Sequence, residues 1–161
     1  MRRAVHHVAA TLALALVVAG GVAAVAGAAS PSSASSPQAQ QMRAVVHAWS
    51  ARLNKGDNAG VARLFALPAI MIQGPYAYRL VSREQLAQWH AGLPCSGRVV
   101  SIAIKGRFAT AIFRLGDRRT SKCDAPGTLA AARFEIVRGK IVLWQQVAVP
   151  AKQEPAGSLA S

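Results

Sequence analysis

Residues 48–75, "AWSARLNKGDNAGVARLFALPAIMIQGP", decide the fold class. A helical segment ends here at Gly56, and Asp57 is a good N-cap for a second short helix that we expect to end at Pro68. The apolar run "AIMIQ" then predicts a strand, which Gly74-Pro75 separates from a second strand, "YAYRLVS". The stretch therefore predicts two helices followed by a pair of short strands.

Two amphipathic patterns flank this stretch and predict longer helices. Upstream, one face of residues 38–57 gathers the apolar side chains of Met42, Val45, Val46, Trp49 and Leu53. Downstream, Ser82 and Gln85 form a capping-box pattern that opens a third helix. One face of that helix carries Leu86, Trp89, His90 and Leu93.

The remaining sequence predicts a β-meander of two hairpins. Residues 98–106 and 107–117 alternate like strands around the turn Lys105-Gly106, and residues 128–139 and 140–150 do so around Arg138-Gly139. A polar loop separates the two hairpins. Helices followed by antiparallel strands define the α+β class.

The sequence predicts that the two ends of the chain lie outside this domain. Residues 1–29 start with basic "MRR" and continue as a run of apolar and small residues, which predicts a secretory signal peptide or, as the alternative, an uncleaved anchor helix. Residues 30–40 are expected to be a disordered Ser/Pro linker, and residues 151–161 a flexible tail. The folded domain is then 41–150, in a protein that is secreted or held in the cell envelope.

The chain is strongly basic, with a formal net charge of +13 that falls to +11 without Arg2 and Arg3. The basic residues are scattered along the sequence apart from "DRRTSK" (117–122), so a general solubility role is preferred over a binding stripe. We expect no nucleic-acid partner, and membrane contact only through an uncleaved signal segment.

Cys95 and Cys123 are the two cysteines of the chain, and an exported protein is expected to join them in a disulfide, with two free thiols as the alternative. The closed loop of about 29 residues corresponds to roughly 3.5 kcal/mol of stabilisation. So few potential ligands, without a C-x-x-C spacing, predict no metal site, and no cofactor is expected.

The order of elements and the motifs of residues 40–149 resemble the nuclear transport factor 2-like superfamily, which includes SnoaL-like polyketide cyclases, ketosteroid isomerases and limonene epoxide hydrolases. The resemblance rests on an aromatic residue followed by "LNKGD", a short helix reaching "LFA", and a closing hairpin "RFEIVRGKIVLWQQV". It implies a cone-shaped roll, in which a curved, mostly antiparallel sheet packs over three N-terminal helices.

The same resemblance implies a deep apolar pocket. The expected lining residues are Trp49, Phe65, Gln73, Tyr76, Tyr78, Trp89, Trp144 and Gln146.

Enzymes of this superfamily use carboxylates and a tyrosine in that pocket, and this sequence departs from their pattern. Trp49 stands where the isomerases have a tyrosine, and Gln73 or Gly74 where they have the general base. Ala131 or Ala132 falls at the position of the second aspartate. Since glutamine and alanine cannot exchange a proton at neutral pH, the sequence favours binding over catalysis.

Three functional hypotheses follow from these residues. The first is an exported, single-domain protein that binds a small apolar molecule in its pocket or has a structural role. The second is a SnoaL-like hydrolase or cyclase in which His90 acts with Tyr76, Tyr78 or Glu135. The third is a homodimeric interaction module with a filled pocket, which pairs through the outer sheet face near "VVSIAI".

Overall fold

The structure is a computed structural model that describes residues 36–150. The predicted signal peptide and tail lie outside these residues. The helices and strands follow one another in this order: α1 (Pro37–Asn54), α2 (Asn58–Ala62), β1 (Phe65–Gln73), β2 (Tyr76–Leu80), α3 (Arg83–Ala91), β3 (Ser96–Lys105), β4 (Phe108–Gly116), β5 (Leu129–Val137) and β6 (Lys140–Val147).

Helix α1 begins earlier than the sequence pattern suggested. The Ser36 side chain accepts a hydrogen bond from the Ala39 backbone N–H, and Pro37 occupies the first helical turn. Serine at the N-cap and proline just inside are typical of a helix start. The assignment of residues 36–40 to a disordered linker was therefore wrong.

Helix α2 is shorter than expected, and Pro68 does not end it. Asp57 caps the helix by accepting from the Gly60 N–H at 2.8 Å, as predicted, but the helix stops at Ala62. Pro68 instead lies inside β1, after a cis peptide bond, where the pairing of β1 with β6 is irregular. Proline has no N–H to donate to a sheet, so it is tolerated at such an irregularity. Pairing with β6 has overridden the local helical pattern of residues 63–67.

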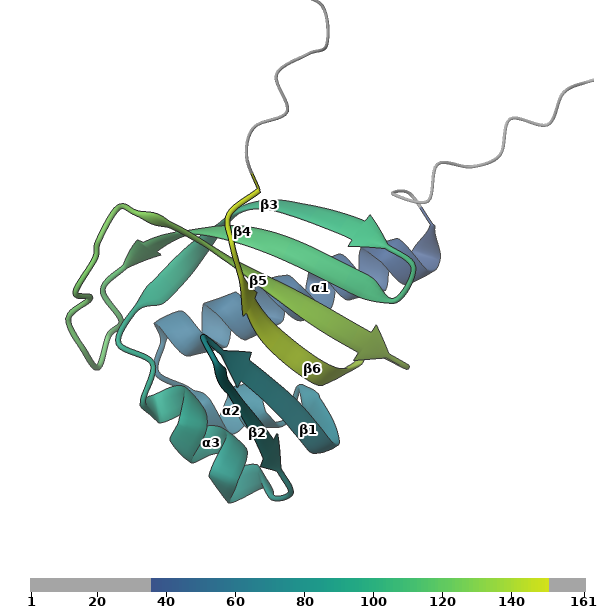
Figure 1. The fold of residues 1–161 in the computed structure, drawn as a ribbon, viewed down its shortest axis with the longest axis horizontal. Coiled ribbons are helices and arrows are strands. Elements are labelled where there is room, and N and C mark those ends of the chain that lie inside the picture. The colour runs from purple at the N-terminus through teal and green to yellow at the C-terminus, as the bar shows by residue number, and fades with distance from the viewer. Residues whose placement is uncertain (1–35, 151–161) are drawn as a thin grey trace, which may run out of the picture. The chain divides into compact units, whose positions relative to one another are not determined.

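The strands form one mixed sheet in the order β2-β1-β6-β5-β4-β3 (Figure 1). All neighbours are antiparallel except β1 and β6, which are parallel. Both predicted hairpins are confirmed. The turn between β5 and β6 places Arg138 and Gly139 at φ angles of 51° and 71°, as a tight two-residue hairpin turn requires.

The helices cover one face of the sheet, which we call the inner face. Helix α1 lies against β3 and β4, and α2 packs against α3. The apolar side of α1 meets Ala109, Ala111 and Phe113 of β4 and Phe134 of β5, all of which are buried. Since alternate strand residues point to opposite faces, the even-numbered residues of β4 form part of an uncovered outer face.

The predicted α+β class, with a curved, mostly antiparallel sheet and helices on its N-terminal side, is confirmed. Within residues 36–150, none of the helices has the length and apolar character needed to cross a membrane.

Candidate functional site

A pocket of about 170 Å³ opens between the inner face of the sheet, helix α1 and the segment that joins α3 to β3. Its walls are mostly apolar and come from Trp49, Leu53, Leu93, Phe113, Leu115 and Trp144. Four polar residues also contribute to the lining: Gln73, Ser96, Asp124 and Gln146. The site thus has an apolar body with a few polar points, as small-molecule sites usually do.

Small residues create the space for this pocket. Residues 130–132 of β5 are all alanine and line it, so the middle of the sheet carries no bulky side chain there. Gly97 approaches so closely that a Cβ at this position would lie 2.9 Å from the Cβ of Phe113. The chain therefore needs glycine at 97 to hold the Phe113 ring against this wall.

The structure brings four of the predicted lining residues together at the pocket: Trp49, Gln73, Trp144 and Gln146. The other four lie elsewhere. Phe65 is completely buried and packs against the His90 ring, with centroids 5.2 Å apart. Tyr76 and Tyr78 lie on the edge strand β2 and are 65% and 42% exposed. Trp89 lines a separate groove beside β2 and α3.

Tyr76 and Tyr78 miss the pocket because of their position in the sheet. They pair with Gln73 and Met71 and so share the inner face. Strand β2 is the outermost strand, however, and no element covers this side of the two rings in the described part of the chain. Strand alternation predicts the face correctly but not the distance from the centre of the sheet.

His90 is fully buried, and both of its ring nitrogens are hydrogen-bonded. Nδ1 lies 2.7 Å from the Leu86 carbonyl oxygen, and Nε2 accepts from the Trp49 indole N–H at 3.1 Å. Because a carbonyl can only accept, Nδ1 carries the proton and the ring is neutral. This geometry leaves no nitrogen to receive a proton from a substrate.

The environment of His90 opposes protonation. The pKa of His90 is lowered from about 6.5 to about 4, mainly by burial; the hydrogen bond to Leu86 acts in the opposite direction, and the positive charge of Arg118 contributes a smaller lowering. A neutral imidazole with two fixed partners has a structural role, since a general base works best with a pKa close to the operating pH.

The alternative hypothesis of an enzyme required His90 beside Tyr76, Tyr78 or Glu135, and the structure does not bring them together. Glu135 pairs in register with Phe108 on the outer face and forms an ion pair with Arg107 at 3.0 Å. His90 lies in the core beneath the opposite face of the sheet, bonded to Trp49 and Leu86. No proton relay joins these residues.

The indole N–H of Trp144 is buried and has no hydrogen-bond partner among residues 36–150. Trp144 lines the pocket and contacts the Trp49 ring, with centroids 6.3 Å apart. A buried donor without an acceptor is uncommon in a folded protein and is often accounted for by a bound water or ligand. Because this N–H is itself buried, it lies beneath the surface of the pocket wall.

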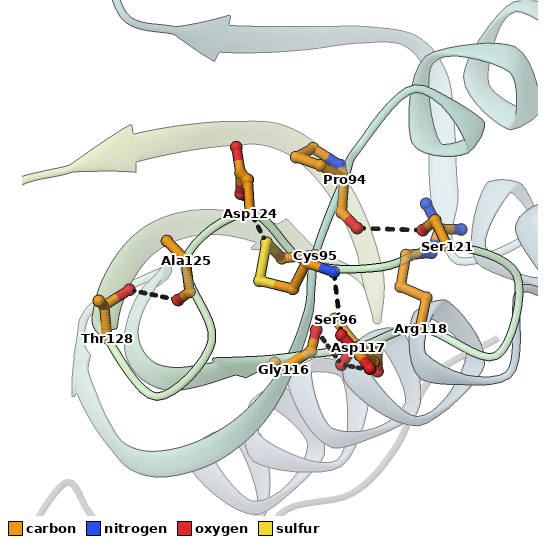
Figure 2. Close-up of a disulfide and its surroundings, with 12 residues drawn as sticks. Pro94, Cys95, Ser96, Gly116, Asp117, Arg118, Ser121, Asp124, Ala125 and Thr128 are labelled. Atoms are coloured by element: carbon orange, nitrogen blue, oxygen red, sulfur yellow. Dashed lines mark hydrogen bonds between the residues drawn. A yellow bond between two sulfur atoms is a disulfide. The ribbon is translucent and has the colours of Figure 1, made fainter.

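The predicted disulfide between Cys95 and Cys123 is present, with a Cα–Cα distance of 4.4 Å (Figure 2). It ties the long loop between β4 and β5 to the segment that enters β3. The Ser121 hydroxyl strengthens this connection by donating to the Pro94 carbonyl at 3.0 Å. One wall of the pocket contains Cys95, so the bridge holds the loop at the pocket mouth.

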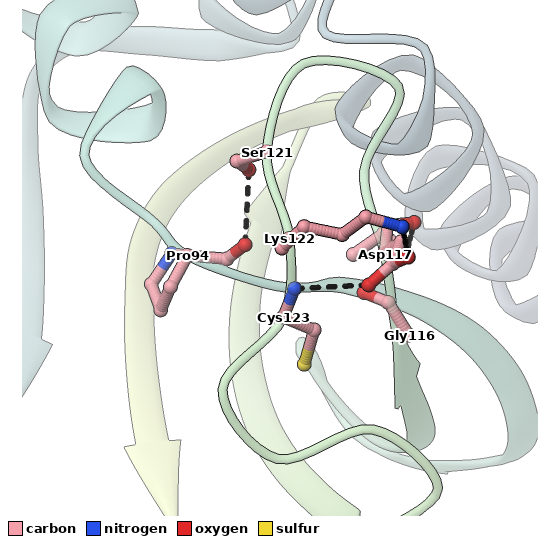
Figure 3. Close-up of polar contacts among 7 residues, drawn as sticks. Pro94, Gly116, Asp117, Ser121, Lys122 and Cys123 are labelled. Carbon is pink, nitrogen blue, oxygen red and sulfur yellow. Dashed lines mark hydrogen bonds and ion pairs between the residues drawn. The ribbon is translucent and has the colours of Figure 1, made fainter.

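Asp117 and Asp124 organise this loop in different ways. Asp117 accepts from the Cys123 N–H at 3.0 Å and pairs with Lys122 at 2.6 Å, and these contacts lower its pKa (Figure 3). Asp124 lines the pocket mouth, with its Oδ1 3.1 Å from the Cys95 sulfur. The sequence predicted only a polar loop here; the disulfide, which brings Asp124 to the pocket, was the signal that could have revealed its place.

Cys95, Cys123 and Asp124 form the one cluster of potential metal ligands in the described range. Both sulfurs are committed to the disulfide, which removes the thiolates that would bind a metal. The remaining carboxylate alone is not a metal site.

Arg118 anchors the same loop from inside the fold, a role that the sequence did not reveal. It is only 4% exposed and donates from Nη1 to the carbonyls of His90 and Leu93 at 2.8 and 2.6 Å. Its Nη2 donates to the Asn58 side chain at 2.6 Å. The guanidinium thereby satisfies the last carbonyls of α3, where a positive charge also complements the helix dipole.

Comparison with known families and curated proteins finds no match by sequence. Solved structures, by contrast, resemble the fold. A nuclear transport factor 2-like protein of unknown function from Cytophaga hutchinsonii aligns with a TM-score of 0.54 and 10% identity, over 65% of this chain and 87% of that chain. A putative polyketide cyclase from Sinorhizobium meliloti aligns with a TM-score of 0.55 and 13% identity, over 67% and 99% of the two chains.

A putative ketosteroid isomerase from Kribbella flavida also has a similar fold, with a TM-score of 0.54 and 18% identity over 73% of this chain and 84% of that chain. Identities this low carry the fold and not the activity. The fold of residues 36–150 is that of the nuclear transport factor 2-like superfamily, as its motifs indicated.

Proposed function

We propose that this protein is exported and binds a small apolar molecule in its pocket without converting it chemically. The observation that carries the proposal is the apolar pocket itself, with Trp49, Phe113 and Trp144 in its walls. Apolar walls favour a ligand through the removal of its surface from water.

The size of the pocket favours a compact ligand. At about 170 Å³ it is close to the roughly 150 Å³ of an engineered cavity that holds benzene. Pockets for drug-sized molecules run from about 300 to 1,000 Å³. A molecule with a single ring, or an aliphatic one of similar volume, therefore suits the site better than a steroid or a polyketide.

The polar residues of the lining favour a ligand that also accepts hydrogen bonds. The amides of Gln73 and Gln146 can donate to a carbonyl or hydroxyl oxygen, and a small shift of the Trp144 ring would bring its unpartnered N–H to the pocket surface as a further donor. These contacts would orient the molecule, while the aromatic walls supply most of the affinity.

The absence of an assembled proton-transfer group supports binding without turnover. Of the pocket-lining residues, Asp124 alone has a carboxyl group, and it lies at the mouth beside the disulfide. Gln73 and Ala131 or Ala132 stand where the resembling enzymes have acids. His90 is held neutral by burial and by its two partners.

Export is supported by two independent features. The first 29 residues have the composition of a signal peptide, and the disulfide between Cys95 and Cys123 suits an oxidising compartment.

The test is a titration of the ¹⁵N-labelled protein with toluene, phenol and indole, monitored by NMR. We expect saturable shifts of pocket signals, and tighter binding of phenol than of toluene, because the phenol oxygen can accept a hydrogen bond from the polar residues of the lining. The Ala130→Leu variant should lose binding, because Ala130 faces inward beside Phe113 and the larger side chain fills the pocket.

The matched control is Ala103→Leu, the same enlargement at an exposed residue of β3 outside the pocket. It should bind all three molecules as the unmodified protein does, and thermal melts should show that both variants fold. Equal binding by the two variants, or no saturable shift with any of the three molecules, would overturn the proposal.

A further inference from the structure

The outer face of β3, β4 and β5 gathers basic side chains that are scattered in the sequence. Arg98 and Arg114 are directly opposite each other in the β3–β4 register. Arg133 is opposite Thr110, and Lys105 opposite Phe108. Because the odd-numbered residues of β4 are buried toward the helices, these basic residues share the uncovered side of the sheet. We call Arg98, Lys105, Arg114 and Arg133 the basic face.

The charge of the basic face is not balanced by acids. Glu135 is the one acidic residue on this side of the described strands, and it already pairs with Arg107. Arg114 donates to the Gly127 carbonyl and Arg133 to the Gln145 side chain, so both are held in place but not neutralised. Both acceptors are uncharged groups, so these contacts supply no negative charge to the basic face.

The pairing of Arg98 with Arg114 is unfavourable in the isolated protein. Like charges directly opposite each other on neighbouring strands destabilise a sheet. An anion bound between them would remove that repulsion and gain contacts to both guanidinium groups. The register itself thus points to an anionic partner.

Exposed apolar side chains lie among these charges. Leu129 is opposite Arg114 and is 44% exposed, and Val100, in the β3 bulge two residues after Arg98, is 52% exposed. Val149, which is 37% exposed, lies two residues after the end of β6, the strand that pairs with β5. Basic residues mixed with apolar ones suit the head groups and acyl boundary of an anionic lipid surface.

We propose that the basic face binds anionic lipid membranes. A soluble polyanion would use the arginines but gain nothing from Leu129 or Val100. A second copy of this chain is disfavoured, because a symmetric pair would bring the arginines of both copies together. This surface lies on the opposite side of the sheet from the pocket, so its function does not depend on the pocket ligand.

The test is co-sedimentation of the full chain with phosphatidylcholine vesicles, with and without phosphatidylglycerol. Since residues 1–29 are themselves apolar, the readout is the ratio of binding to the two kinds of vesicle. Each basic residue near an anionic surface strengthens binding about fivefold. The double variant Arg98→Gln/Arg114→Gln should therefore lower this ratio by about 25-fold.

Lys55→Gln/Arg63→Gln is the matched control, because it removes two exposed basic residues on the helical side. For this control, the ratio of binding to vesicles with and without phosphatidylglycerol should stay within about twofold of that of the unmodified protein, once the effect of the lower net charge is subtracted. Leu129→Ser should weaken vesicle binding while leaving the affinity for polyglutamate unchanged. Melts of all variants should confirm that they fold.

Three results would overturn the proposal. The first is an equal loss of binding in the two double variants, which would indicate net charge alone. The second is binding of polyglutamate through Arg98 and Arg114 without a preference for phosphatidylglycerol, which would indicate a soluble polyanion. The third is a dimer by sedimentation that Arg98→Gln/Arg114→Gln alters, which would indicate a second copy of the chain.

Discussion

The buried neutral imidazole of His90 predicts a stability that depends on pH. In the unfolded chain a histidine has a pKa of about 6.5, whereas burial lowers the pKa of His90 to about 4. Between these values the unfolded state binds more protons than the folded state, so stability falls as the pH falls. The loss begins near pH 6.5 and is complete near pH 4.

The magnitude follows from the two pKa values. Between pH 7.5 and 5.0, protonation of the unfolded chain at this one site stabilises it by about 2 kcal/mol relative to the folded state. Carboxylates such as Asp117, whose pKa is lowered, lose their contribution only at more acidic pH. The window from pH 7.5 to 5.0 therefore separates His90 from the acids.

Urea unfolding monitored by circular dichroism measures this loss. With a slope of about 1–3 kcal/mol per molar urea, the midpoint should fall by about 1–2 M between pH 7.5 and 5.0. His90→Gln removes the titrating group, so its midpoint should change far less over the same range. His47→Gln replaces an exposed histidine of α1 and should keep the full pH dependence.

A midpoint that stays constant in the unmodified protein would refute the argument, as would an unchanged pH dependence in His90→Gln. If His90→Gln does not fold, the imidazole proton signals of the unmodified protein decide the question. A His90 signal that titrates near pH 6.5 would show that the ring is accessible to protons and is not held neutral.

Three further variants test the framework around the pocket. Cys123→Ser should lower the free energy of unfolding by about 2–4 kcal/mol under oxidising conditions and by little under reducing ones, as urea titrations would show. Arg118→Met leaves the last carbonyls of α3 without their donor and should cost about 3 kcal/mol, whereas its exposed neighbour Arg119→Met should change the melt little. Gly97→Ala places a Cβ 2.9 Å from that of Phe113 and should cost about 1–3 kcal/mol, again read from a melt, while Gly92→Ala, with contacts no closer than 3.4 Å, should be tolerated.

Local signals in the sequence were sufficient for most of the fold. Asp57 and Ser82 cap α2 and α3 as their motifs predicted, and Gly106 and Gly139 form the hairpin turns. Each of these features depends on neighbouring residues along the chain. Pro68 was misread because its place in β1 depends on pairing with β6, more than 70 residues away.

The candidate site was harder to predict from the sequence, because its residues are far apart in the chain and come together only in the folded structure. Trp144 and Gln146 are two residues apart in one strand, so strand alternation gives them the same face, and both line the pocket. Strand alternation could not show that Tyr76 and Tyr78 lie on an edge strand. Nor could it show that Asp124 reaches the mouth through the disulfide.

The basic face illustrates the same limit. Arg98 and Arg114 are separated by 15 intervening residues in the chain, yet the β3–β4 register makes them direct neighbours. Charge runs along the sequence therefore reveal only the loop segment at 117–122. The pairing of strands, and not the spacing of residues, creates this surface.

The indole N–H signals of the three tryptophans test the central claim most directly. The pocket is proposed to hold a small apolar molecule against Trp144, whose N–H has no partner among the described residues, whereas the Trp49 N–H is bonded to His90. Titration with phenol in a ¹H–¹⁵N correlation experiment should move the Trp144 signal strongly and to saturation. The signal of Trp89, which lies outside the pocket but packs against the Trp144 ring with centroids 5.0 Å apart, should move less. A Trp144 signal that does not move, or that moves no more than that of Trp89, would contradict the account.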